Sequence, residues 1–102
     1  MQVTITARHY DIPDDLRARA EDLVARLAKL AVRPTSAHVT FDQEKARATA
    51  EVVLTAARGA VHVAAADADD HRTALDRVAA KLRRQLDKQE PPARRARKAG
   101  VR

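Results

Sequence analysis

The sequence predicts an α+β fold in which a four-stranded mixed sheet carries two helices on one face, in the order β-α-β-β-β-α. In four short segments apolar residues alternate with polar ones, which is the period of a half-buried strand. In two longer segments they recur every three or four residues, which is the period of an amphipathic helix. With 102 residues the chain has room for one domain. Packing both helices on one face of the sheet buries every apolar stripe.

The first strand and the first helix are predicted over residues 2–8 and from Pro13 to about residue 31. Proline suits the first helical turn, and acidic Asp14 and Asp15 suit the positive end of the helix dipole. Arg33 precedes a proline and therefore resists the helical conformation, which ends the helix. The expected apolar stripe of this helix is Leu16, Ala20, Leu23, Leu27 and Leu30.

Three short strands follow, over residues 36–42, 48–55 and 60–65, with turns of hairpin length between them. The apolar sets expected to face the core are Ala37, Val39 and Phe41, then Ala48, Ala50, Val52 and Leu54, then Val61, Val63 and Ala65. His38 and His62 are then expected on the face away from the helices. The first strand-helix-strand unit should be a right-handed crossover, which makes the first two strands parallel and the sheet mixed.

The second helix is predicted to begin near Asp70 and to continue to about Gln89, before Pro91 and Pro92 stop it. Its expected core face is Leu75, Val78, Ala79, Leu82 and Leu86. Residues 91–102 have too little apolar content to fold and are predicted to be a disordered basic tail. The predicted organisation is one domain over residues 1–90 followed by this tail.

Positive charge is concentrated in the last third of the chain. Residues 1–70 carry nine Lys and Arg against eleven Asp and Glu, whereas residues 71–102 carry eleven against three. The net charge of +6 therefore comes entirely from the C-terminal third. Such asymmetry indicates a polyanionic partner that meets one end of the fold.

The second predicted helix carries a band of cations on the side opposite its core face. Arg77, Lys81, Arg84 and Lys88 are spaced four, three and four residues apart, and Arg83 lies beside the band. Two pairs in this band are like-charged at a spacing of four, which weakens an isolated helix by a few tenths of a kcal/mol. Contacts with phosphates would offset that repulsion, so the band is a candidate RNA-binding surface. On the first helix, Arg19 and Arg26 could extend the surface across the groove between the helices.

Other classes of function have little support in the sequence. The chain has no cysteine, and its four histidines fall on different elements, so we expect no metal site. It has no phosphate-binding glycine loop and no nucleophile motif, so we expect neither an enzyme, nor a cofactor, nor a small-molecule substrate. No apolar run reaches the length of a membrane span, and no export leader precedes the first strand, which predicts a cytoplasmic protein without a membrane partner.

Five segments resemble the short ribosome hibernation-promoting factors, the family of the ribosome-associated inhibitor protein Y. They are residues 1–6 (MQVTIT), 12–17 (IPDDLR), 44–45 (EK), 70–76 (DHRTALD) and 81–86 (KLRRQL). The last two are similar to the family's Asp-Met-Tyr-Ala-Ala-Ile-Asp and Lys-Leu-x-x-Gln-Leu, and the spacing between them also fits. The resemblance covers about residues 1–90. It departs from the family pattern at His71-Arg72, where the family has Met-Tyr.

The resemblance implies a β-α-β-β-β-α fold related in shape to double-stranded RNA-binding domains. It also implies binding to ribosomal RNA of the small (30S) subunit, in the channel for messenger and transfer RNA, and inhibition of translation. The residues that it favours are Lys81, Arg84 and Lys88, with Arg83 and Arg77 next. Longer members of the family continue into a domain that pairs ribosomes, so we expect no direct, self-driven pairing of ribosomes by this chain, while indirect promotion of pairing stays open. We also expect a monomer off the ribosome.

Two other functions stay open at this point. A general double-stranded RNA-binding module would use similar recognition by charge and shape. A protein-protein adaptor acting on transcription is the second alternative. Salt-sensitive binding to isolated RNA duplexes would favour the first of these, whereas tight binding only to assembled small subunits would favour the hibernation factor.

Overall fold

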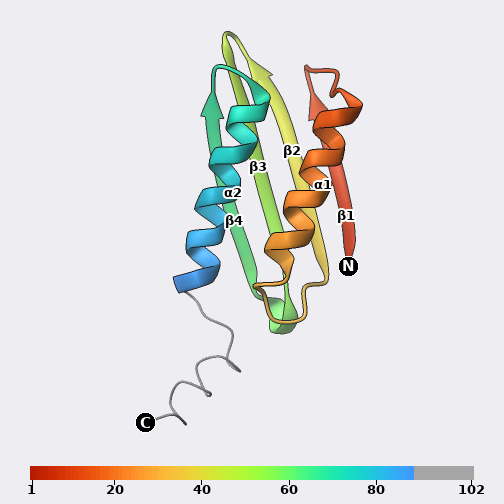
Figure 1. Ribbon diagram of the computed structural model, residues 1–102, viewed down its shortest axis with the longest axis vertical. Helices are drawn as coiled ribbons and strands as arrows, with labels where there is room; N and C mark the ends of the chain where they lie inside the picture. The colour runs from red at the N-terminus through yellow and green to blue at the C-terminus, as the bar shows by residue number, and fades with distance from the viewer. Residues whose placement is uncertain (89–102) are drawn as a thin grey trace.

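The computed structural model describes residues 1–88, which form one sheet covered by two helices. The strands are β1 (Gln2–Arg8), β2 (Ser36–Glu44), β3 (Arg47–Thr55) and β4 (Val61–Ala68), and the helices are α1 (Asp14–Ala28) and α2 (His71–Lys88). The strand order is β1-β2-β3-β4, with β1 parallel to β2 and the other neighbours antiparallel. Both helices lie on the same face (Figure 1), which confirms the predicted fold. The predicted tail, residues 91–102, lies outside the described residues.

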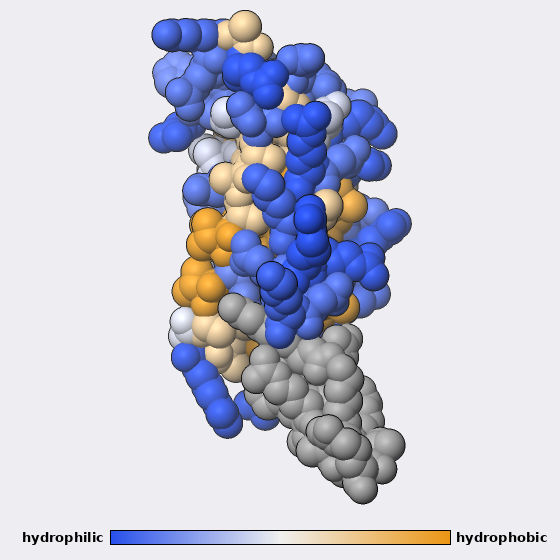
Figure 2. Space-filling view, turned by 90° about the vertical axis from the view of Figure 1, so that its left-hand side faces the viewer, coloured by the Kyte–Doolittle hydropathy of each residue, from blue (hydrophilic) through white to orange (hydrophobic). Residues whose placement is uncertain are grey.

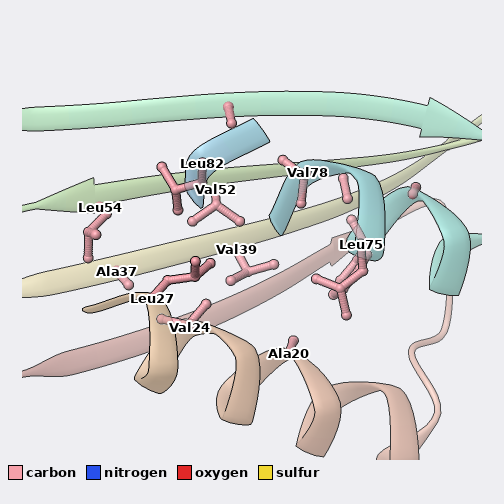
Figure 3. Packing of buried hydrophobic residues seen from close by; sticks show 14 of the residues in the cluster. Ala20, Val24, Leu27, Ala37, Val39, Val52, Leu54, Leu75, Val78 and Leu82 are labelled. Carbon is pink, nitrogen blue, oxygen red and sulfur yellow. The ribbon is translucent and has the colours of Figure 1, made fainter. Parts of the chain in front are cut away.

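The core fills the space between the helices and the sheet (Figure 3). Because the chain has only two aromatic residues among Phe, Trp and Tyr, the core is mainly aliphatic. Leu27 and Leu82, which the sequence predicts to be buried, are 8% and 1% exposed. The largest fully buried side chains are Phe41, Leu54, Leu75, Leu82, Val24, Val39, Val52 and Val78.

Helix α1 ends three residues earlier than the sequence predicts. After Ala28, the backbone N–H groups of Leu30 and Ala31 bond to carbonyls three residues back, so the chain turns more tightly than an α-helix. The buried side of α1 is also rotated relative to the predicted stripe. Val24 and Ala28 are buried, whereas Leu23 and Leu30 are only half-buried against the edge of the core.

Strand β4 presents the opposite face from the one that the sequence predicts. Leu54 of β3 faces the core and pairs with His62, so His62 also faces the helices and is only 9% exposed. Val61 and Val63 therefore lie on the open face of the sheet, 54% and 45% exposed. Each alternating set of β4 is mostly apolar and contains one polar residue, Asp67 or His62, so the pattern gives no clear direction, and a shift of one residue exchanges the faces. The core side of β4 otherwise carries only alanine, which lets α2 approach the sheet closely.

Candidate nucleic-acid interface

Two side chains hold the start of α2: Asp70, which directly precedes the helix, and His71, which is its first residue. A carboxylate oxygen of Asp70 accepts a hydrogen bond from the backbone N–H of Thr73, at 3.3 Å, which caps the helix. A side-chain hydrogen bond with Thr73 is the main cause that keeps the pKa of Asp70 below its usual range, and the backbone hydrogen bond also lowers this pKa. Helix α1 has no such side-chain cap, because the residue at that position is Pro13.

His71 anchors the first turn of α2 in the core. Its Nε2–H donates a hydrogen bond of 2.8 Å to the backbone carbonyl of Asp42, and its ring stacks on Tyr10 with centroids 3.6 Å apart. Burial is the main cause that raises the pKa of Tyr10, followed by the charges of Asp15 and Asp70. His71 and Arg72 are the two residues that depart from the family's Met-Tyr pair. Of these, His71 packs in the core, and Arg72 is exposed.

All five predicted RNA-binding residues of α2 are exposed, namely Arg77, Lys81, Arg83, Arg84 and Lys88. Three of them, Arg77, Lys81 and Arg84, line one shallow hollow between α2 and β4 with a volume of about 250 Å³. Figure 2 faces this edge of the molecule and shows hydrophilic residues gathered over the helix. The structure thus brings the predicted band together on one surface.

A ladder of side-chain hydrogen bonds joins this surface to the outer edge of β4. Arg77 Nη1 donates to the carbonyl of Asp67 at 2.9 Å, and Lys81 Nζ donates to that of Ala65 at 2.8 Å. Gln85 Nε2 donates to the carbonyl of Val63 at 2.6 Å. The donors are four residues apart on α2, a rise of about 6 Å, and the acceptors are two residues apart on β4, a rise of about 6.7 Å. These two spacings are similar enough for three successive donors to reach three successive carbonyls. We call these three bonds the edge ladder.

The edge ladder divides the predicted residues into two groups. Arg77 and Lys81 already donate to the protein backbone, so they are held in place beside the hollow. Within residues 1–88, Arg83, Arg84 and Lys88 form no side-chain hydrogen bond and no ion pair, and all three residues are exposed. Sequence reasoning missed Gln85, although long donor side chains at residues 77, 81 and 85 repeat at a spacing of four.

On α1, both predicted residues are paired with acids. Arg19 Nη2 lies 2.8 Å from Asp76 of α2, so Arg19 does reach across the groove between the helices. Arg26 Nη2 lies 2.9 Å from Asp22, one turn earlier on α1 itself. The charges of these arginines are therefore partly compensated, unlike those at the C-terminal end of α2.

The open face of the sheet has the opposite electrostatic character. A hollow there is lined by four acidic residues, Asp42, Glu44, Glu51 and Asp67, and by two cations, Arg8 and Lys81, so acids are in excess. A hydrogen bond with His9 is the main cause that lowers the pKa of Asp42, and a hydrogen bond with Arg47 does the same for Asp67. Both groups therefore stay ionised well below neutral pH. A polyanion would be repelled from this face and attracted to α2.

Within residues 1–88, no group of three or more His, Cys, Asp or Glu side chains is placed to hold a metal ion. His38 lies on the open face as predicted, where its Nε2 is 2.8 Å from Thr6 Oγ1. In the same part of the chain, no helix is long and apolar enough to cross a membrane.

The sequence matches the family described as sigma 54 modulation protein / S30EA ribosomal protein over residues 3–91. The chain belongs to this family. A ribosome hibernation promoting factor from Azotobacter vinelandii is 39% identical over 88 residues, which cover 86% of this chain and 81% of the relative. The resemblance to ribosome hibernation-promoting factors that the sequence segments indicated is thereby confirmed.

Two solved structures share the fold of this S30EA family member. A ribosomal subunit interface protein from Coxiella burnetii superposes with a TM-score of 0.75 and 23% identity, covering 87% of this chain and 97% of the other. The N-terminal domain of Thermus thermophilus protein Y gives a TM-score of 0.76, also at 23% identity, covering 88% and 100%. At this level of identity the two comparisons support the fold alone.

Proposed function

We propose that this protein is a ribosome hibernation factor that binds the small subunit through α2 and inhibits translation. The observation that carries the proposal is the difference in charge between the surface of α2 and the open face of the sheet. Helix α2 has six basic and two acidic residues, whereas four acidic and two basic side chains line the hollow on the open face. Ribosomal RNA presents a dense array of phosphates, which would select the α2 side.

The binding place that we propose is the channel for messenger and transfer RNA on the small subunit. The family resemblance supports this place, and the name of the Azotobacter relative, a ribosome hibernation promoting factor, supports the ribosome as the partner. Arg83, Arg84 and Lys88 would contact phosphates directly, because their donors have no partner within residues 1–88. Arg77 and Lys81 would contribute from the hollow, with Arg19 and Arg26 at the margin. The five basic residues within 91–102 would add sequence-independent attraction to RNA.

The proposal is tested by sedimentation of the purified protein with 30S, 50S and 70S particles at several salt concentrations. The informative variant is Arg84→Glu with Lys88→Glu, because neither side chain supports the fold of residues 1–88. We expect it to weaken 30S binding by about two orders of magnitude and to lower the salt dependence by about 1.5 units for two lost phosphate contacts. Inhibition of translation in a cell-free system should fall in parallel.

The matched control is Arg17→Glu with Lys45→Glu. These cations are also exposed and form no side-chain ion pair within residues 1–88, and the change in charge is the same. They lie on α1 and in the β2–β3 hairpin, away from the proposed surface. Near-normal 30S binding by the α2 variant, or an equal loss in the control, would show that the cations of α2 are only a solvated surface.

The same assay separates this proposal from a general double-stranded RNA-binding module. A hibernation factor should bind 30S particles far more tightly than an isolated RNA duplex of comparable length. Equal affinity for both at the same salt concentration would favour the general module, which recognises duplex shape and phosphates without the ribosome.

A further inference from the structure

A cavity of about 390 Å³ opens at the end of the molecule opposite the β2–β3 hairpin. Its apolar wall includes Leu30, Val32 and Leu86, and its polar groups are Arg33, Arg58 and His62. The site comprises the segment after α1, the turn between β3 and β4, and the last turns of α2. The volume falls within the range of small-molecule sites. It is separate from the cationic hollow between α2 and β4.

Backbone hydrogen bonds fix the wall of this cavity. The N–H of Ala57 bonds to the carbonyl of Val32 at 3.0 Å, which joins the two loops, and the N–H of Thr35 bonds to the carbonyl of Thr55 at 2.8 Å. Both arginines of the cavity have a left-handed backbone, with φ of 48° at Arg33 and 62° at Arg58. Glycine or asparagine adopts this conformation more easily. The loops therefore carry cations at two positions where local backbone preference favours other residues.

His62 is the polar group of the cavity interior. Its residue is 9% exposed and it lines the cavity, yet its ring forms no hydrogen bond within residues 1–88. Its two nitrogens are not sealed off, because the described residues contain no fully buried side-chain nitrogen or oxygen without a partner. A buried ring with open nitrogens can bond to a ligand that enters.

We propose that this cavity binds a small amphipathic carboxylate. The apolar body would contact the side chains of Leu30, Val32 and Leu86. The carboxylate would lie near Arg33 and Arg58, within reach of the His62 ring. No acidic residue of the described chain lines the cavity, so the field there favours an anion. The aliphatic wall offers few partners for the polar edges of a nucleobase, which favours a hydrocarbon body instead.

The probe is decanoate, titrated below its micellar concentration into the full chain labelled with ¹⁵N. Decyltrimethylammonium has the same chain length and the opposite charge, and 5′-AMP tests a nucleotide. We expect saturable shifts from decanoate at residues 30–33, 56–62 and 86, with at least about tenfold weaker binding of the ammonium compound and of AMP. Because this comparison uses the unaltered protein, it does not depend on the folding of any variant.

The variant Arg33→Asn with Arg58→Asn removes both cations and places at each position a residue that tolerates positive φ. We expect the dissociation constant for decanoate to rise about tenfold, without loss of thermal stability. Lys45→Asn is the control, because Lys45 also has positive φ, at 53°, but lies in the distant hairpin. It should leave decanoate binding unchanged.

Four results would overturn the proposal. They are shifts that map outside the cavity, equal binding of the ammonium compound, tighter binding of AMP at the same residues, and unchanged decanoate binding in the double asparagine variant. A similar loss in the Lys45 control would show that net charge rather than the cavity governs binding.

Discussion

The two helices lie side by side on the same face of the sheet, yet they differ in nearly every property that bears on RNA binding. Helix α1 has three basic and four acidic residues, and two of its arginines are paired with carboxylates. Helix α2 has six basic and two acidic residues, and the cations at its C-terminal end are unpaired within residues 1–88. The helices also differ in their start, since α2 is capped by Asp70 and anchored by His71.

This difference shows that two helices on the same face of one sheet can present surfaces of different charge. Helix α1 covers the sheet over β1 and β2 and carries charges that largely compensate one another. Helix α2 has exposed cations, and hydrogen bonds hold it at its start and along the side next to β4. A helix that is held at its start and along its side loses little conformational freedom when it binds, which favours affinity. The following comparisons test how far the two helices differ.

The largest effect is expected in the core. Leu82 of α2 is 1% exposed, so Leu82→Ala should lower the free energy of unfolding by about 2–5 kcal/mol. Leu23 of α1 is only half-buried, so Leu23→Ala should cost clearly less, because less apolar area is lost. Urea denaturation of both variants measures the two values. Equal losses would contradict the assigned helix faces.

The next effect concerns the paired arginines. Arg19→Glu with Arg26→Glu changes the charge of α1 by the same amount as Arg84→Glu with Lys88→Glu changes that of α2. Because Asp76 and Asp22 already compensate these arginines, we expect less than about a tenfold loss of 30S binding in sedimentation assays. A loss as large as that of the α2 variant would make α1 an equal part of the interface.

A smaller effect should follow from releasing one arginine of α1. Asp76→Asn removes the carboxylate that binds Arg19 Nε and Nη2 and leaves α2 more positive. We expect 30S binding to tighten about two- to threefold, with a steeper salt dependence. Asp22→Asn, which releases Arg26 on the outer side of α1, is the comparison. Weaker binding of the Asp76 variant would indicate that the bridge between the helices orients the surface.

The smallest effect concerns the caps. Asp70→Ala should lower the Tm by a few degrees, whereas Asp14→Ala at the uncapped start of α1 should change it less. The lowered pKa of Asp70 means that the folded state favours its ionised form. The cap should therefore stabilise fully above about pH 4, the range of an unfolded carboxyl, and less as the pH falls through the lowered pKa. The difference in Tm between wild type and Asp70→Ala should shrink in that acid range.

The sequence predicted element types, their order and the mixed sheet, because the apolar periods of β1, β2, β3 and α2 are unambiguous. The prediction was wrong where the apolar pattern allowed two structures almost equally, namely at the buried face of β4 and at the end of α1. On β4, the valines on one side and the alanines on the other led to the wrong choice of the face that meets the core. The pairing of His62 with Leu54 determines that face. On α1, the end at Ala28 depends on a tight turn rather than on a helix-stopping residue.

The exposure of the cations on α2 was predictable from helix geometry, since their spacing places them away from the core. Their differing partners were not predictable, because those depend on the distance between two elements. The alanines on the core side of β4 bring α2 close enough for Lys81 to reach the carbonyl of Ala65. The cavity beside His62 was also hidden, because it forms where three segments distant in sequence meet.

The edge ladder has a further consequence for self-association. Strand β4 is one of the two outer strands of the sheet, and its side chains on the open face include the exposed Val61 and Val63. A free edge of this kind can template the addition of a strand from another molecule, which leads to aggregation. Arg77, Lys81 and Gln85 occupy three carbonyls that such a strand would need. Two of the cations proposed to bind RNA therefore also protect the free protein from edge-to-edge pairing, so any phosphate that draws them away would expose that edge.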